Sequence, residues 1–271
     1  MTAVWTRTVR ALALALALAL AVGPGLDLAN PAPAQAADPV FAESPVSGWA
    51  PTNGLVYAST VVGSVVVVGG SFTQLRQAAT GQVVTRNRIA AFDRTTGALL
   101  TSFAAGANGT VRALTSDGTT VWAGGSFTAI GGRSRARVAA LDPATGTALA
   151  SFNASASSTV FALAHHAGRV YLGGWFASVN GAQRLKLAAV DGGTGALVPG
   201  FVASANDTVT GLVVVPETQT LAVAGAFTSL GGAARRFLGS ASLTTGATTS
   251  WGPPADCADC TLFGVTRAFG L

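Results

Sequence analysis

The stretch Val121-Trp122-Ala123-Gly124-Gly125-Ser126-Phe127-Thr128 decides the fold, because its pattern returns throughout the chain. The aromatic residue recurs at spacings of 55, 49 and 51 residues, as Phe72, Phe127, Phe176 and Phe227. A glycine-containing run precedes each one: Gly69-Gly70-Ser71, Gly124-Gly125-Ser126, Gly173-Gly174-Trp175 and the weakened Ala224-Gly225-Ala226. A fixed period of this length is the signature of a repeat architecture.

A second marker, a turn that opens on aspartate and closes on glycine, moves in step with the first. It occurs at Asp93 to Gly97, Asp142 to Gly146 and Asp191 to Gly195, and it degrades to Ser242 to Gly246. The carboxylate can accept backbone N–H bonds two or three residues on, and the glycine takes a positive φ that a β-carbon opposes. An aromatic follows each closing glycine, in the series Phe103, Phe152, Phe201 and Trp251, with Trp49 beginning it.

One period has room for four short strands and for no helix of ordinary length. The apolar and β-branched runs are Thr110 to Leu114, Thr120 to Gly124, Val138 to Asp142 and Thr147 to Phe152, each bounded by turn residues. Such a unit is typical of a β-propeller blade, and repeated aromatics would fill the wedges between blades. A β-sandwich also alternates strands but needs no internal period, so the period favours the propeller.

The predicted fold is therefore all-β, a propeller of four-stranded antiparallel blades. The repeats are approximately 49-102, 103-151, 152-200 and 201-250, with a partial unit at 251-271. We expect about four to five blades, near the lower end of the usual number. The ring is then either incomplete, as in a truncated gene product, or small and closed by the segment near Val40.

The N-terminal residues 1-36 have the three parts of a secretory signal peptide. Arg7 and Arg10 precede the apolar run Ala11 to Val22, and Ala34-Gln35-Ala36 fits a signal-peptidase site. The apolar run is too short for a membrane span, which needs roughly 20 residues. We expect a secreted, extracellular or cell-surface protein, with residues 37-48 as an extended lead-in.

The chain resembles the delta-60 repeat β-propeller family of bacterial surface and secreted proteins. The resemblance is carried by the G-G-S-F-T cores, the Asp to Gly turns and strands such as Arg137 to Asp142, from about Trp49 to Trp251. Kelch repeats and the fungal cortical polarity-marker family have similar glycine-glycine-aromatic blades. The resemblance implies a propeller and an extracellular setting, and it implies no established activity.

Charge is scarce and mostly basic. Charged residues make up 10% of the chain, and the formal net charge is +5. Two basic positions recur before the turn aspartate, occupied by Arg86 and Arg88, Arg135 and Arg137, and Arg184 and Lys186. Rotational repetition would arrange them in rings that attract an anionic surface polymer, and the expected partner is a cell-surface polysaccharide or protein. The alternative is that each arginine satisfies a carbonyl or an aspartate at the blade rim. Nucleic acid is not an expected partner, because the arginines do not cluster and the protein is exported.

No catalytic constellation emerges, and no cofactor or metal is expected. Cys257 and Cys260 are the only cysteines and predict a short local disulfide in an exported protein. His165 and His166 fall where the repeat predicts a solvated hairpin. The turn aspartates could in principle bind calcium, but each loop has one carboxylate, which favours turn capping.

Three functions remain open at this point. The chain is a binding or interaction scaffold, a structural repeat fragment of a larger surface protein, or a propeller-based hydrolase or lyase with an unrecognised site. Propeller folds serve many unrelated functions, so the fold alone selects none of them.

Overall fold

The computed structural model describes residues 48–252, all within the larger of two compact units, Pro45–Leu271. The predicted signal peptide, residues 37–47 of the lead-in, both cysteines and residues 253–271 of the partial fifth repeat lie outside these residues. The predictions made for them, including the disulfide, stay predictions.

Each of the four repeats forms one three-stranded antiparallel sheet with its first strand at one edge. In chain order the sheets are β2 (Val56–Val62), β3 (Val65–Gly70) and β6 (Ile89–Asp93); β7 (Val111–Ser116), β8 (Val121–Gly125) and β11 (Val138–Leu141); β12 (Val160–His166), β13 (Arg169–Gly174) and β16 (Leu187–Asp191); and β17 (Val209–Val215), β18 (Thr220–Gly225) and β21 (Leu238–Ser242).

The fourth strand of each blade is reduced to a single β-bridge after the aspartate turn. The bridges are Phe92↔Leu99, Leu141↔Ala148, Val190↔Leu197 and Ala241↔Thr248. They place the expected last strand beside β6, β11, β16 and β21, at the edge opposite the first strand. The antiparallel blade predicted from the sequence is therefore present, with a shorter outer edge.

Every repeat also contains a small hairpin that the sequence reading did not predict. These hairpins are β4 (Gln74–Gln77) with β5 (Val83–Thr85), β9 (Ala129–Ile130) with β10 (Arg133–Ser134), β14 (Ser178–Val179) with β15 (Ala182–Gln183), and β19 (Ser229–Leu230) with β20 (Ala233–Ala234). Each pairs with the segment ahead of its blade's first strand, which is β1 (Trp49–Pro51) in the first repeat. A single 3-10 turn, η1 (Pro216–Thr218), is the one helical element among residues 48–252.

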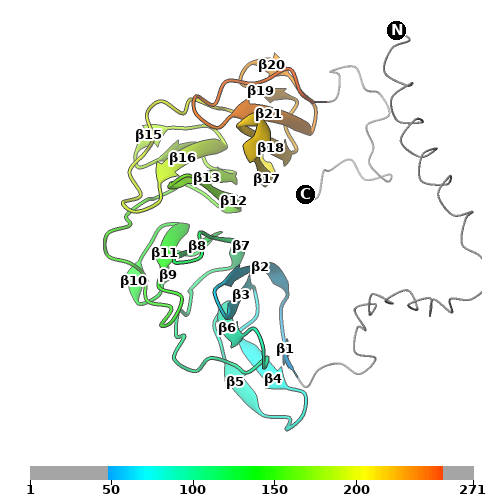
Figure 1. Ribbon diagram of the computed structural model, residues 1–271, viewed down its shortest axis with the longest axis vertical. Helices are drawn as coiled ribbons and strands as arrows, with labels where there is room; N and C mark the ends of the chain where they lie inside the picture. Colours follow the sequence, from blue (N-terminus) through cyan, green and yellow to red (C-terminus); the bar gives the residue numbers. More distant parts are fainter. Residues whose placement is uncertain (1–47, 253–271) are drawn as a thin grey trace, which may run out of the picture. The chain divides into compact units, whose positions relative to one another are not determined.

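The first strands of successive blades contact one another in the order β2, β7, β12 and β17. Figure 1 shows these four strands along the inner side of their sheets, as in a propeller. Backbone hydrogen bonds also join successive repeats, from Ala107 N–H to Asn87 O, Ala156 N–H to Ala136 O and Ala205 N–H to Leu185 O. Within residues 48–252 hydrogen bonds do not close the ring.

Six of the repeated phenylalanines lie in the wedges between blades, and Phe72 packs within the first repeat. Phe103 and Phe127 share a buried cluster with Val67 and Ile89 of the preceding blade, and the next two boundaries repeat this arrangement. The seven phenylalanines of the two series are fully buried: Phe72, Phe103, Phe127, Phe152, Phe176, Phe201 and Phe227. Trp251, which ends the second series near the limit of the described residues, is exposed instead.

The two glycines of each of the first three cores have separate steric roles. A Cβ added at Gly124 would lie 2.7 Å from Cγ1 of Val160 in the next blade, and Gly69 and Gly173 face the equivalent valines. A Cβ at Gly125 would lie only 2.0 Å from the carbonyl oxygen of Thr110 in its own blade. The first glycine therefore permits contact between blades, and the second permits contact within a blade.

Candidate binding sites

The three aspartate turns hold their carboxylates by hydrogen bonds within the turn. Oδ1 of Asp142 accepts from the N–H groups of Ala144 and Thr145 at 3.0 and 2.8 Å and from the Thr145 hydroxyl at 2.8 Å. Asp93 and Asp191 repeat this pattern, and the closing Gly97, Gly146 and Gly195 have φ of 69°, 73° and 76°. Hydrogen bonds from the threonine of the turn hold the pKa of each of these carboxyl groups below its usual value.

The first residue of each basic pair is bonded to the backbone of its own blade. The guanidinium groups of Arg86, Arg135 and Arg184 donate from Nη1 to the carbonyl of the preceding residue at 2.8–3.0 Å. Arg135 also donates from Nη2 to Leu149 O at 2.9 Å, and burial lowers its pKa, with a smaller contribution from the charge of Arg133. This geometry corresponds to the carbonyl-bonded alternative rather than to a free ring.

The second residue of each pair has a left-handed backbone. Arg88, Arg137 and Lys186 have φ of 68°, 69° and 66°, and their N–H groups donate to the carbonyls of Phe72, Phe127 and Phe176. Their side chains differ. Arg88 donates across the blade boundary to Ala107 O at 3.0 Å, the ammonium of Lys186 lies 5.9 Å from the ring centre of exposed Trp175, and Arg137 has no partner within residues 48–252.

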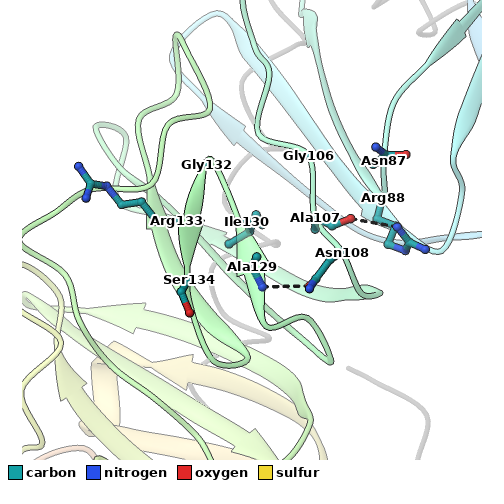
Figure 2. A pocket seen from close by; sticks show the side chains of 10 residues that line it. All are labelled: Asn87, Arg88, Gly106, Ala107, Asn108, Ala129, Ile130, Gly132, Arg133 and Ser134. Atoms are coloured by element: carbon teal, nitrogen blue, oxygen red, sulfur yellow. Dashed lines mark hydrogen bonds between the residues drawn. The ribbon is translucent and has the colours of Figure 1, made fainter.

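A pocket of about 520 Å³ lies at the boundary of the first two blades, and we call it the blade-boundary pocket. Its lining comprises Asn87, Arg88, Gly106, Ala107, Asn108, Ala129, Ile130, Gly132, Arg133 and Ser134. Figure 2 shows Arg88 directed toward Ala107 and Arg133 extending away on the other side. The lining thus includes one predicted basic residue, Arg88, and on the opposite side a second arginine, Arg133, that the sequence reading did not select.

Both arginines of the blade-boundary pocket are tethered by one N–H group and keep others available. Arg133 donates from Nε to Ala148 O at 2.9 Å, and Arg88 donates from Nη1 to Ala107 O. No acidic residue lines the pocket. The pocket is consequently electropositive, with anchored cations rather than freely moving ones.

In three repeats an asparagine ahead of the first strand holds the start of the small hairpin, and Asn108 does so in the lining of the blade-boundary pocket. Asn108 accepts at Oδ1 from the N–H groups of Thr128 and Ala129 at 2.8 and 2.9 Å, and its Nδ2 donates to the Thr128 hydroxyl. Asn53 and Asn206 make the same three bonds in the first and fourth repeats. These bonds join residues about twenty positions apart in the sequence.

A second basic site lies on the inner strands, and the sequence reading missed it. Each inner strand has a register shift at its second residue, which is Tyr57, Arg112, Phe161 or Thr210. Cζ of Arg112 lies 4.6 Å from the ring centre of Tyr57 and 5.6 Å from that of Phe161. We call Tyr57, Arg112 and Phe161 the inner-strand cluster. The signal available in the sequence was a shared position just inside each first strand.

His165 and His166 lie at the end of β12, on the arm of the predicted hairpin. Their environments differ from a fully solvated turn. The ring of His165 stacks on buried Trp122 of the preceding blade, with centroids 4.8 Å apart, and its desolvation lowers its pKa despite the opposing charge of Asp117. The Trp122 indole N–H donates to Gly192 O at 3.2 Å, and at the next boundary the Tyr171 hydroxyl donates to Leu243 O.

The described residues contain no group of three or more histidine, cysteine or acidic side chains placed to hold a metal ion. No helix within them has the length and apolar character needed to cross a membrane.

The repeated sheets and the wedge cores between them define the class: an all-β protein built from β-propeller blades. Similar solved structures include the computationally designed protein Ika4, with 21% identity and a TM-score of 0.45 over 65% of this chain and 89% of that one. The designed protein Ika8 has 16% identity and a TM-score of 0.42, covering 71% and 60% of the two chains. The WD40 β-propeller domain of Doa1 has 13% identity and a TM-score of 0.40, covering 74% and 57%. No protein-family model and no curated protein sequence matches the chain significantly.

Proposed function

We propose that this chain is a secreted or cell-surface binding scaffold that holds an anionic polysaccharide at the blade-boundary pocket. The observation that supports this most directly is the pocket itself, whose lining includes Arg88 and Arg133 and no acidic residue. Guanidinium groups pair well with carboxylate and sulfate oxygens, and an open pocket can admit one segment of a long chain.

The proposed extracellular location depends on the predicted signal peptide. The low content of acidic side chains near the pocket suits the negatively charged polymers of a cell surface. Membership of the delta-60 repeat family is part of the same proposal, supported by the repeated G-G-S-F-T cores and aspartate turns.

The two alternative functions, a hydrolase or lyase and a structural repeat fragment, predict different results with an acidic polysaccharide. A hydrolase or lyase would shorten an acidic polysaccharide and release new reducing ends, whereas a structural repeat fragment would bind none. The carboxylates of the aspartate turns accept capping hydrogen bonds within their own turns. This supports a structural role for them rather than a role as general acids or bases, and so supports binding over catalysis.

The test is a titration of the full chain with polygalacturonate, with neutral dextran as the control polymer. We expect saturable binding that weakens as salt is added, because salt screens exposed charge pairs. In the double variant Arg88→Asn/Arg133→Gln we expect at least about a tenfold loss of affinity, equal to about 1.4 kcal/mol. Asparagine is chosen at position 88 because it tolerates the positive φ there.

Arg94→Gln is the matched control, since it removes the same charge from an exposed turn residue outside the pocket. It should leave the affinity within about twofold of wild type. Equal binding by the double variant and wild type would remove the proposed site, and cleavage of the polymer would favour the hydrolase or lyase.

A further inference from the structure

The inner-strand cluster carries an unpaired guanidinium in a fixed position. Arg112 comes from β7, while Tyr57 and Phe161 come from the neighbouring strands β2 and β12, so three successive blades contribute to one site. The register shift lies at the same residue in each strand, and a bulge of this kind redirects a side chain out of the regular sheet alternation.

The two aromatic rings hold the guanidinium but do not satisfy its hydrogen bonds. A ring face attracts a cation through its quadrupole, which restrains Cζ while leaving the N–H groups in the guanidinium plane. Nε of Arg112 is buried and has no hydrogen-bond partner, and within residues 48–252 the group has no ion-pair partner. A half-buried cation without an anion is costly, so a ligand that supplied one would bind favourably.

No acidic side chain among residues 48–252 is paired with Arg112. Asp93, Asp142 and Asp191 are capped within their own turns, and Asp117 accepts from the N–H groups of Thr119 and Thr120 at 2.8 Å. The other arginines with buried Nε atoms, such as Arg135, already donate to carbonyl oxygens from Nη. Arg112 is different from them because both its restraints are aromatic rings.

We propose that the inner-strand cluster binds a single oxyanion group of a small ligand, with Arg112 pairing to it and Tyr57 and Phe161 holding the guanidinium in place. A planar guanidinium suits two parallel hydrogen bonds to a carboxylate or sulfate group. One charge limits the site to one oxyanion. The aromatic flanks suit a ligand with an apolar or sugar ring beside that group. This site is separate from the blade-boundary pocket and does not depend on polymer binding there.

The test measures binding of monosaccharides to the full chain by NMR, following the Nε–H signal of Arg112. The probes are galacturonate for a carboxylate, galactose 6-sulfate for a sulfate, and galactose as the neutral control. We expect the signal to shift with at least one anionic sugar and not with galactose. A shift with galacturonate alone or with the sulfate alone would support the site and identify its oxyanion. Binding of neither anionic sugar would overturn the proposal.

Variants separate binding from a structural role of the cation, and their affinities are measured by isothermal titration calorimetry because the Arg112 signal is absent from the Arg112 variants. Arg112→Gln should weaken binding at least about tenfold, and Arg112→Lys should keep part of the affinity because it retains charge without the planar fork. The double variant Arg88→Asn/Arg133→Gln should bind the monosaccharide as wild type does. Wild-type affinity in folded Arg112→Gln, or loss of affinity in the double variant instead, would overturn the assignment.

If Arg112→Gln does not fold, Tyr57→Leu gives a second test, because Tyr57 is partly exposed and its loss frees the guanidinium without removing the charge. We expect severalfold weaker binding there. Unchanged affinity in Tyr57→Leu together with unchanged affinity in Arg112→Lys would contradict the proposed geometry.

Discussion

At several positions of the repeat, contact between blades depends on a single glycine. Gly124 gives a direct test, because its missing side chain provides the space for Val160 of the next blade. We expect Gly124→Ala to lower the free energy of unfolding by about 1–3 kcal/mol, the usual cost of overpacking. Urea unfolding measures this change, and Val160→Ala in the same chain should restore part of the loss.

Gly200→Ala is the control for that substitution, since a Cβ there would meet no atom within 4 Å and no positive φ is required. It should change stability by less than about 0.5 kcal/mol. Equal losses at Gly124 and Gly200 would mean that the proposed contact between blades does not limit the first glycine.

Residue roles were predictable where they depend on local chemistry. The turn aspartates and their closing glycines have fixed neighbours in sequence, so the capping bonds and the positive φ could be expected from the repeat. The bracing by Asn108, the stacking of His165 on Trp122 and the inner-strand cluster could not, because each depends on a partner in a distant loop or another blade. The basic pairs fall between these cases: their repetition was visible, but their carbonyl partners were not.

Among the elements, the aspartate turns are expected to make the stability of the fold depend on pH. Folding lowers the pKa of Asp93, Asp142 and Asp191 below the usual value of 3.8, so the folded chain binds fewer protons than the unfolded chain in that range. Their contribution to stability is complete above about pH 4 and is lost as the pH falls through the lower folded values.

The triple variant Asp93→Asn/Asp142→Asn/Asp191→Asn tests this dependence. Asparagine keeps an acceptor oxygen but does not titrate, so the variant should lose less stability than wild type between about pH 5 and pH 2. Thermal unfolding followed by circular dichroism at several pH values measures the difference. Identical acid profiles of the two proteins would exclude the turns as the source of the pH dependence.

The small hairpins could not be predicted from the sequence. β9 and β10 have two residues each, too few for an alternating pattern to stand out, although they pair with the segment that leads into the blade. The last strand of each blade was predicted over several residues and is a single bridge, because the chain leaves the sheet soon after the closing glycine.

At the scale of the whole molecule, stability depends on the cores between blades. Phe152 is fully buried in a cluster that joins Trp122 and Val138 of the second blade to residues of the third. We expect Phe152→Ala to cost about 3–5 kcal/mol in urea unfolding, because it leaves a cavity at a blade boundary. Trp251→Ala, at an exposed member of the same series, should cost far less. A larger loss at Trp251 would contradict this assignment of the aromatic series.

The central proposal is that the blade-boundary pocket binds an anionic polysaccharide. Hydrogen–deuterium exchange of the full chain, with and without saturating polygalacturonate, tests that proposal most directly. The account predicts new protection at Asn87 to Arg88 and at Ala129 to Ser134, with little change in the equivalent hairpin β19–β20 of the fourth repeat. Protection confined to other blades, or spread evenly over all four, would contradict it.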